Sequence, residues 1–317
     1  MIIDAHAHIM RRVHGQIGAG RTRSLPYGRI QVGEQTTARL LPPLSRQLSS
    51  FPPDILLEQM DSAGVDKAVL LQGSFYGTPN RYVAGAVKRY PDRFIGAAFI
   101  DPRSRGARRA WDRLTQELGF TIVKFEMSEG FGFTGLYPDL SLLGDEMAWM
   151  WEAAERQGLV IVLDLGAVGS RSYQTAAVRE ILARHPRLRV VIAHLAQPPI
   201  AHPNDARLDR LWQEQIELGR SPNVWFDVSS LPAYASPEDY PYASARQYVE
   251  RAVNLIGPEK LMWGTDLPSL LTHATYPQLL GYISRHCDFL SPEALRGVLG
   301  ENAWRVYGPF PQERNHI

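Results

Sequence analysis

Eight short runs of strand-like composition recur along the chain and alternate with longer segments of helical spacing. The runs are rich in Val, Ile, Leu and Phe and are bounded by polar or turn-forming residues, as strands buried on both faces are. They cover residues 2–6, 67–72, 94–100, 121–127, 159–165, 189–195, 223–229 and 260–266. This alternation predicts a (β/α)8 TIM barrel, and an open, doubly wound sheet is the alternative.

The segments between the runs carry helix start and stop signals. Residues 53–64 begin at a proline and end at a glycine, and residues 146–158 also end at a glycine. Residues 174–186 show the same apolar spacing and stop at a proline. No Gly/Ser-rich linker and no change of composition interrupts the pattern, so we expect one domain over residues 1–317.

Two connecting segments are longer than ordinary turns. They are residues 9–52, after the first run, and residues 128–144, after the fourth. Loops of this length inside a compact domain usually serve as lids or binding elements. We therefore expect both loops to lie over the functional end of the barrel, with a packed structural loop as the alternative.

The overall charge limits the classes of partner. The chain has 34 basic and 33 acidic residues, a formal net charge of +1, so no global field attracts nucleic acid or an anionic membrane. We expect neither as a partner, and polyanion binding would need a local basic patch. A hydrophobic content of 44% is typical of a globular protein with a large core.

Cysteine and hydropathy patterns indicate the compartment. Cys287 is the only cysteine, which excludes an intramolecular disulfide and a cysteine-based zinc cage. The sequence shows neither a signal-peptide pattern nor a run of about 20 apolar residues. We expect a cytoplasmic protein without a membrane anchor.

Titratable residues gather at the carboxyl ends of the predicted strands, which is where barrel enzymes place their chemistry. They are His6 and His8, Lys124 and Glu126, Asp164, His194, Asp227 and Asp266. His6 and His8 are two residues apart and share one face of a strand. In a closed barrel the last strand adjoins the first, so Asp266 can join them around one cation.

Two imidazoles and a carboxylate favour Zn²⁺, Mn²⁺ or Fe²⁺ over Ca²⁺ and Mg²⁺, which prefer oxygen ligands throughout. We predict a divalent metal, with zinc first and manganese second. An open coordination position would hold a water whose pKa falls towards about 7 on zinc.

Five stretches together resemble a known family: IIDAHAHI, VVIAHLA, NVWFDVSS, LMWGTDLP and LGENAWRVYG. They are similar to the amidohydrolase superfamily, in the branch related to aminocarboxymuconate semialdehyde decarboxylase and lactonases, from residue 1 to about 308. The resemblance implies that His6 and His8 bind metal and that Asp266 binds metal or accepts a proton. It also implies that His194 polarises the substrate or exchanges protons with it.

The chain departs from the family pattern at the fifth strand, where Asp164 stands in place of a metal-binding histidine. Either Asp164 completes a set of two histidines and two aspartates, or the metal is weakly bound or absent, as the resemblance to lactonases allows. Relatives with two metals bridge them through a carboxylated lysine on the fourth strand, and Lys124 occupies that place. Lys124 pairing with Glu126, or holding a substrate carboxylate, are the alternatives.

The resemblance implies either hydrolysis of an ester, lactone or amide, or non-oxidative decarboxylation of a hydroxylated aromatic or muconate-type acid. HLAQ after the sixth strand and the helix that begins at Gln174 resemble the hydrolases more closely, so we expect a hydrolase. A non-catalytic binding protein with a decayed site is the third hypothesis.

The expected substrate is a small carboxylated or hydroxylated compound, because cationic residues follow the catalytic strands. The predicted substrate-binding residues are Arg11, Arg12, Lys124, Glu126 and Arg171, and a solvated surface role is the alternative for the arginines. Trp149 and Trp151 leave room for a homodimer interface.

Overall fold

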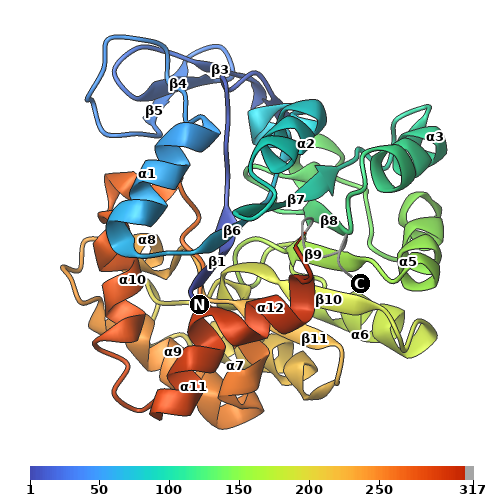
Figure 1. The fold of residues 1–317 in the computed structure, drawn as a ribbon. Helices are drawn as coiled ribbons and strands as arrows, with labels where there is room; N and C mark the ends of the chain where they lie inside the picture. Colours follow the sequence, from blue (N-terminus) through green and yellow to red (C-terminus); the bar gives the residue numbers. More distant parts are fainter. Residues whose placement is uncertain (311–317) are drawn as a thin grey trace.

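The structure, a computed structural model, describes residues 1–310. Eight parallel strands form one sheet in which every strand lies beside its neighbours in the chain (Figure 1). They are β1 (Ile3–Ala7), β6 (Lys67–Leu70), β7 (Phe94–Phe99), β8 (Ile122–Glu126), β9 (Val160–Asp164), β10 (Arg189–Ile192), β11 (Val224–Asp227) and β12 (Leu261–Met262). This sequential order confirms the predicted barrel and excludes a doubly wound sheet, whose strand order reverses.

The barrel closes where the chain after β12 meets β1. The amide of Ala5 donates to the carbonyl of Trp263 at 2.9 Å, and Ala7 forms a parallel bridge with Leu267. The first and last strands are therefore neighbours, which brings His6, His8 and Asp266 to the same edge.

Helices surround the barrel and cover its outer face (Figure 1). They are α1 (Pro53–Ala63), α2 (Asn80–Arg89), α3 (Ala107–Asp112), α5 (Asp145–Gln157), α6 (Thr175–Arg184), α7 (Ala206–Ile216), α9 (Ala243–Ile256), α10 (Tyr276–Ser284), α11 (Pro292–Arg296) and α12 (Asn302–Tyr307), with short turns α4 (Phe133–Leu136) and α8 (Leu231–Tyr234). Among residues 1–310, no helix has the length and apolar content that a bilayer crossing requires.

The long segment after β1 differs from the loop that we expected. It contains a four-stranded antiparallel sheet of β2 (Gln16–Ile17), β3 (Gly20–Ser24), β4 (Arg29–Val32) and β5 (Thr36–Arg39). These strands are short and are rich in arginine, threonine and glutamine, with few large apolar residues, so their composition resembles a loop. We call this small sheet and its connections, residues 9–52, the excursion.

Side chains from seven strands fill the interior of the barrel, and α12 closes its amino-terminal end. The cluster consists of Ile3, Ala5, Val69, Leu71, Ile95, Ala97, Ile122, Val160, Val162, Val191, Ala193, Met262, Ala303, Val306, Tyr307 and Phe310. This apolar plug leaves the opposite end of the barrel to polar side chains.

An irregularity in β1 turns the two histidines inward. Ile3 and Ala5 belong to the interior cluster, so strict alternation would point His6 and His8 away from it. The pairing of β1 with β6 shifts register between Asp4 and Ala7. Beyond this shift, His6 reaches the interior side chain of Lys124 on β8.

A buried carboxylate fixes the junction between β1 and the end of β12. Asp4 is fully buried and accepts hydrogen bonds from the His6 amide at 3.1 Å and from the Thr265 amide at 2.9 Å. The hydroxyls of Thr265 and Tyr276 also donate to it, at 2.6 and 2.9 Å. The backbone on both sides of the metal-ligand candidates is therefore held by one side chain.

The same junction requires a glycine. A Cβ atom at Gly264 would lie 2.9 Å from both the Cβ and the amide nitrogen of His6. We predict that Gly264→Ala forces β1 and the end of β12 apart and lowers the free energy of unfolding by about 1–3 kcal/mol, measured by urea denaturation. Gly130→Ala is the control, because no atom lies within 4 Å of its added Cβ. Equal stability of the two variants would contradict this description of the junction.

Candidate metal and catalytic centre

The strand-end residues predicted from the sequence come together at the carboxyl end of the barrel. The side chains of His6, Lys124, Asp164 and His194 are at most 6% exposed, and that of Asp266 is 17% exposed. Asp266 is therefore the member of the group with the most contact with solvent, and the cluster is a nearly buried set of charges with one open side.

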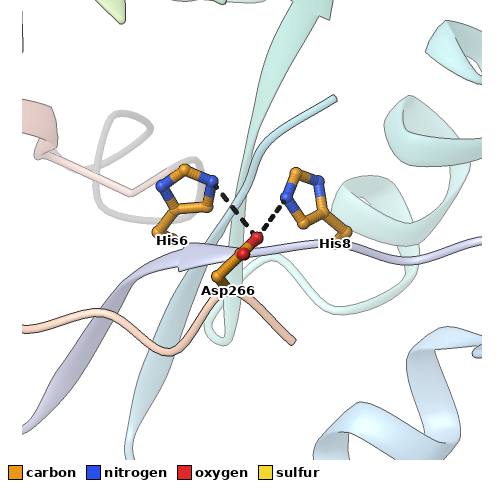
Figure 2. A group of neighbouring side chains, drawn as sticks. All are labelled: His6, His8 and Asp266. Carbon is orange, nitrogen blue, oxygen red and sulfur yellow. Dashed lines mark hydrogen bonds and ion pairs between the residues drawn. The ribbon is translucent and has the colours of Figure 1, made fainter. Parts of the chain in front are cut away.

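His6 and His8 both point toward the carboxylate of Asp266 (Figure 2). The Nε2 atom of His8 lies 3.0 Å from Oδ1 of Asp266, and the Nε2 atom of His6 lies 3.8 Å from the same oxygen. The three ligand atoms lie within 4.8 Å of one another. This spacing allows one cation to contact all three.

Hydrogen bonds on the far side of each ring determine which nitrogen carries the proton. Nδ1 of His6 donates to the carboxylate of Asp227 at 3.0 Å, and Nδ1 of His8 donates to the backbone carbonyl of Leu71 at 2.9 Å. Both acceptors lack hydrogen, so each Nδ1 is protonated and each neutral ring presents an Nε2 lone pair to Asp266.

Burial keeps the two rings neutral. It lowers the pKa of His6 to about 4 against the attraction of Asp227, and it lowers the pKa of His8 against the attraction of Asp266. The His8 Nε2 lone pair therefore faces a carboxylate oxygen at 3.0 Å with no hydrogen of its own. A cation between these atoms would satisfy both of them, and two imidazole nitrogens with one carboxylate oxygen form a donor set that fits a divalent transition metal.

Asp227 has a structural role that the sequence did not reveal, although it was placed at a strand end. Besides orienting His6, it accepts hydrogen bonds from the backbone amide of His194 at 3.0 Å and from the hydroxyl of Ser229. Burial alone would raise the pKa of Asp227, but His6 lowers it below the ordinary value, so the group is ionised. Asp227 also lies within ligand distance of His6 and His194.

His194 lies just beyond β10, in a run of left-handed backbone. The φ angles of His194, Leu195, Ala196 and Gln197 are 58°, 49°, 57° and 45°. Four consecutive residues with side chains in this region are unusual and costly. The strand was expected to continue to residue 195, but it ends at Ile192 because this turn redirects the chain and places the imidazole over the barrel mouth.

Both ring nitrogens of His194 act as donors. Ser229 gives its own hydrogen to Asp227, so its oxygen accepts from Nδ1 of His194 at 2.7 Å, and Asp164 accepts from Nε2 at 3.0 Å. Burial disfavours the imidazolium, but the charge of Asp164 outweighs it and raises the pKa of His194 to about 9. His194 is therefore a cation at neutral pH.

Asp164 reaches the cluster through His194 and not through His6 or His8. Although burial opposes ionisation, the His194 cation lowers the pKa of Asp164 well below its ordinary value. Glu126 lies on the other side of Asp164, and burial followed by the charge of Asp164 raises the pKa of Glu126 to about 8. One carboxylate and one carboxylic acid therefore stand side by side at neutral pH.

Lys124 lies between Glu126 and His6. Its ammonium group is 3.5 Å from Oε2 of Glu126 and donates to Nε2 of His6 at 3.3 Å. Burial lowers its pKa, but Glu126 and Asp164 together raise it above the ordinary value, so the amine is charged. The His6 lone pair thus already faces one cation.

The three predicted arginines lie on the surface. Arg171 is 62% exposed and pairs with Glu129 at 2.6 Å. The guanidinium groups of Arg11 and Arg12 are exposed and form no ion pair with any residue between 1 and 310. A substrate role for these residues stays a prediction.

Two tyrosines beside the cluster were missed. The Tyr76 ring lies 4.8 Å from that of His8, and the Tyr234 ring lies 6.4 Å from that of His194. Burial raises the pKa of both phenols, followed by the charge of Asp266 at Tyr76 and the charge of Asp164 at Tyr234. Tyr76 follows the second barrel strand within the stretch GSFYG, so its position at a strand end was the available signal.

A separate cavity of about 1390 Å³ lies between the excursion and the barrel rim. Its walls include Gln16, Arg21, Ser74, Phe133 and Tyr137. None of the histidines or carboxylates of the cluster lines it, so it is distinct from the candidate centre.

Comparison with known proteins agrees with this architecture. A family model described as amidohydrolase matches residues 3–308. An L-fucono-1,5-lactonase from Burkholderia ambifaria is 36% identical over 128 residues, which are 39% of this chain and 43% of that protein. The alignment therefore spans less than half the length of this relative.

Solved structures are similar over nearly the whole chain. An amidohydrolase from Burkholderia multivorans with bound zinc is 18% identical, with a TM-score of 0.70 and coverage of 97% of this chain and 99% of that chain. A probable 2-pyrone-4,6-dicarboxylic acid hydrolase from Acinetobacter baumannii is also 18% identical, with a TM-score of 0.69 and the same coverage. At this identity the likeness establishes the fold.

The charge of His194 predicts a pH dependence of stability. Its pKa of about 9 lies above the ordinary value of 6.5, so its stabilising contribution is complete below pH 6.5 and is lost as the pH rises through about 9. We predict that metal-free protein loses stability to urea over this window and that His194→Gln flattens the loss. His202→Gln, at an exposed position, should leave the profile unchanged. A profile that is identical in wild type and His194→Gln would contradict the assigned charge.

Proposed function

This chain belongs to the amidohydrolase family, and from that premise we propose that it is a metal-dependent hydrolase of a small lactone or related ester. The observation that carries the proposal is the pair of neutral imidazoles whose Nε2 atoms lie 3.0 and 3.8 Å from one carboxylate oxygen. The choice of a lactone rests on the sequence relative named as a lactonase. The whole chain acts as one catalytic unit in this proposal.

We assign His6, His8 and Asp266 as the metal ligands and zinc as the metal, with manganese as the second choice. The zinc-containing structural neighbour supports zinc. When bound, the metal supplies a Lewis acid that polarises the carbonyl and lowers the pKa of a water. Asp164 is not assigned as a ligand, because its carboxylate is engaged by His194 and lies outside the His6, His8 and Asp266 group.

Asp266 is also the group best placed to accept a proton. The interaction with His8 first, and then the charge of His194, lower the pKa of its carboxylate far below the ordinary value despite burial, so it is ionised at neutral pH. Its Oδ2 atom accepts from the hydroxyls of Ser230 and Ser269, which orient it. A water that attacks the carbonyl carbon passes its proton to Asp266, and the departing ring alkoxide takes that proton as the C–O bond breaks.

Charge that develops on the carbonyl oxygen is stabilised by cations and donors already in place. Lys124 and His194 are both charged and nearly buried. Preorganised charges of this kind stabilise a developing negative charge more strongly in a site that excludes water. The Tyr76 hydroxyl forms no hydrogen bond with residues 1–310 and is free to donate to the substrate. Glu126, largely protonated near neutral pH, and the exposed Arg11, Arg12 and Arg171 are assigned to substrate binding.

Decarboxylation remains the competing reaction, since it would use the same ligands to hold a carboxylate beside a hydroxyl. A screen of lactones and hydroxybenzoates that follows both acid release and carbon dioxide release separates the two. We expect acid release from at least one lactone and no carbon dioxide. Carbon dioxide release alone would establish the decarboxylase, and neither product with any substrate, together with no metal, would support a binding protein.

The ligand assignment predicts the metal content. Protein purified with zinc should contain about one equivalent by elemental analysis, and His6→Ala or His8→Ala should reduce it at least tenfold, since each removes one of three ligands. His202→Ala should retain the metal. Full turnover after complete removal of metal by a chelator would contradict the metal mechanism.

The role of Asp266 predicts the effect of removing its charge. Asp266→Asn should lower kcat by about 10²–10⁴-fold, because it removes the proton acceptor and a ligand, while circular dichroism stays native. Asp112→Asn, at an exposed helix position, should retain full activity. A loss of less than tenfold in Asp266→Asn would exclude the aspartate as the proton acceptor.

A further inference from the structure

Positive charge is concentrated in the excursion. Residues 9–52 contain seven arginines, no lysine and a single acidic residue, Glu34, whereas the whole chain has a net charge of only +1. The arginines are Arg11, Arg12, Arg21, Arg23, Arg29, Arg39 and Arg46. The excursion is therefore a locally basic segment, which the net charge of the whole chain does not reveal.

These arginines also differ from those of the barrel in their partners. None of the seven forms an ion pair with a carboxylate among residues 1–310. By contrast, Arg103 pairs with Asp139 at 2.8 Å and Arg251 pairs with Asp209 at 2.7 Å. Arg23, Arg29 and Arg39 donate hydrogen bonds only to uncharged groups of the excursion, so their charges are not neutralised by any residue between 1 and 310.

The small sheet carries a pairing that local stability does not explain. Arg29 and Arg39 are direct cross-strand partners in the β4–β5 register. Like charges directly opposite one another on a sheet are destabilising. Repulsion between two neighbouring side chains is expected at sites where the charges of another molecule offset it.

Exposed apolar side chains gather beside these charges. Of the seven large hydrophobic residues exposed between residues 1 and 310, four fall between residues 27 and 55. They are Tyr27, Leu44, Leu48 and Ile55, which are 50%, 89%, 38% and 44% exposed. Pro26 forms a bridge with Leu48, and the Tyr27 amide donates to the Ser45 carbonyl at 3.0 Å, so the β3–β4 turn and residues 44–48 lie side by side.

Tyr27 adopts an unfavourable backbone in order to occupy this place. Its φ angle is 61°, in the left-handed region that bulky residues rarely adopt. Arg39 holds the turn by donating to the Tyr27 carbonyl at 3.0 Å. A glycine or asparagine would adopt this backbone at lower cost. The turn therefore does not account for the exposed tyrosine ring, which points to a role for the ring in binding.

Acidic side chains lie in the first turns of α1, which starts directly after the excursion (Figure 1). Asp54 and Glu58 are one helical turn apart, flank the exposed Ile55 and are themselves exposed. Neither forms an ion pair with residues 1–310. The acidic groups in which the excursion is poor thus follow Leu48 by six and ten positions along the chain.

We propose that this surface is the interface of a homodimer related by two-fold symmetry. We call it the tip patch, and it consists of Tyr27, Arg29, Arg39, Leu44, Arg46, Leu48, Asp54, Ile55 and Glu58. A two-fold interface pairs a patch with itself, so it must contain both partners of every ion pair. The tip patch meets this condition, because its arginines can face Asp54 and Glu58 of a second copy around an apolar centre.

A polyanion or an anionic membrane fits the tip patch less well. Asp54 and Glu58 would be repelled by such a partner, and a nucleic acid would leave the exposed Leu44 and Leu48 without contacts. Unpaired arginine and tyrosine around an apolar centre are typical of protein interfaces. The inference does not depend on the proposed reaction.

The tryptophans that suggested a dimer from the sequence lie elsewhere and pack within the chain. Trp151 is buried, and its indole donates to the carbonyl of Leu142 at 2.8 Å. Trp149 packs on Trp111 at 5.5 Å between ring centroids, with the Arg108 guanidinium over its ring. These side chains offer no comparable free surface.

Charge exchange between two variants tests the interface. One variant carries Arg39→Glu and Arg46→Glu, and the other carries Asp54→Arg and Glu58→Arg. Alone, each variant would place like charges across both halves of a two-fold interface. Mixed in equal amounts, they would form a heterodimer in which both halves are again attractive.

The measurement is sedimentation velocity on the full chain at concentrations up to about 100 μM. We expect the wild type to dimerise, each variant alone to dimerise at least a hundredfold more weakly, and the mixture to recover the dimer. Leu44→Ser should also weaken it at least tenfold. Arg105→Glu with Arg109→Glu, exposed on the barrel, should leave it unchanged. A monomeric wild type, or a dimer unaffected by the tip-patch variants, would overturn the proposal.

Discussion

The neutral imidazole rings of His6 and His8 face the carboxylate of Asp266, and the rest of the site is organised around this contact. Asp227 and the Leu71 carbonyl take the Nδ1 protons of His6 and His8, which leaves two lone pairs directed at Asp266. Unpaired, these atoms would repel one another in a nearly buried space. The register shift in β1, the glycine at position 264 and the buried Asp4 carboxylate all hold the backbone that keeps them together.

Around this contact, the surroundings of each titratable group determine whether it is charged or neutral. Lys124 and His194 remain cationic among carboxylates, while Glu126 remains protonated next to the ionised Asp164. The aspartate at the end of the fifth strand keeps His194 cationic. In the proposed mechanism it therefore contributes to the stabilisation of negative charge instead of to metal binding.

The sequence was sufficient to predict the barrel and most of the residues at its mouth. All eight strands were identified, because parallel strands buried on both faces have continuous apolar runs. The role of Asp227 could not be predicted, since it depends on a hydrogen bond to His6 across 221 residues. The small sheet of the excursion was missed because strands rich in arginine and threonine lack that signal, and the left-handed turn at His194 has no glycine to mark it.

The central claim is that His6, His8 and Asp266 bind one metal ion. Anomalous diffraction at the zinc edge, from crystals grown with zinc, tests it directly. The account predicts one strong peak within bonding distance of the Nε2 atoms of His6 and His8 and of a carboxylate oxygen of Asp266. No peak at this position, with the Lys124 ammonium still bound to His6 in the presence of excess zinc, would contradict it.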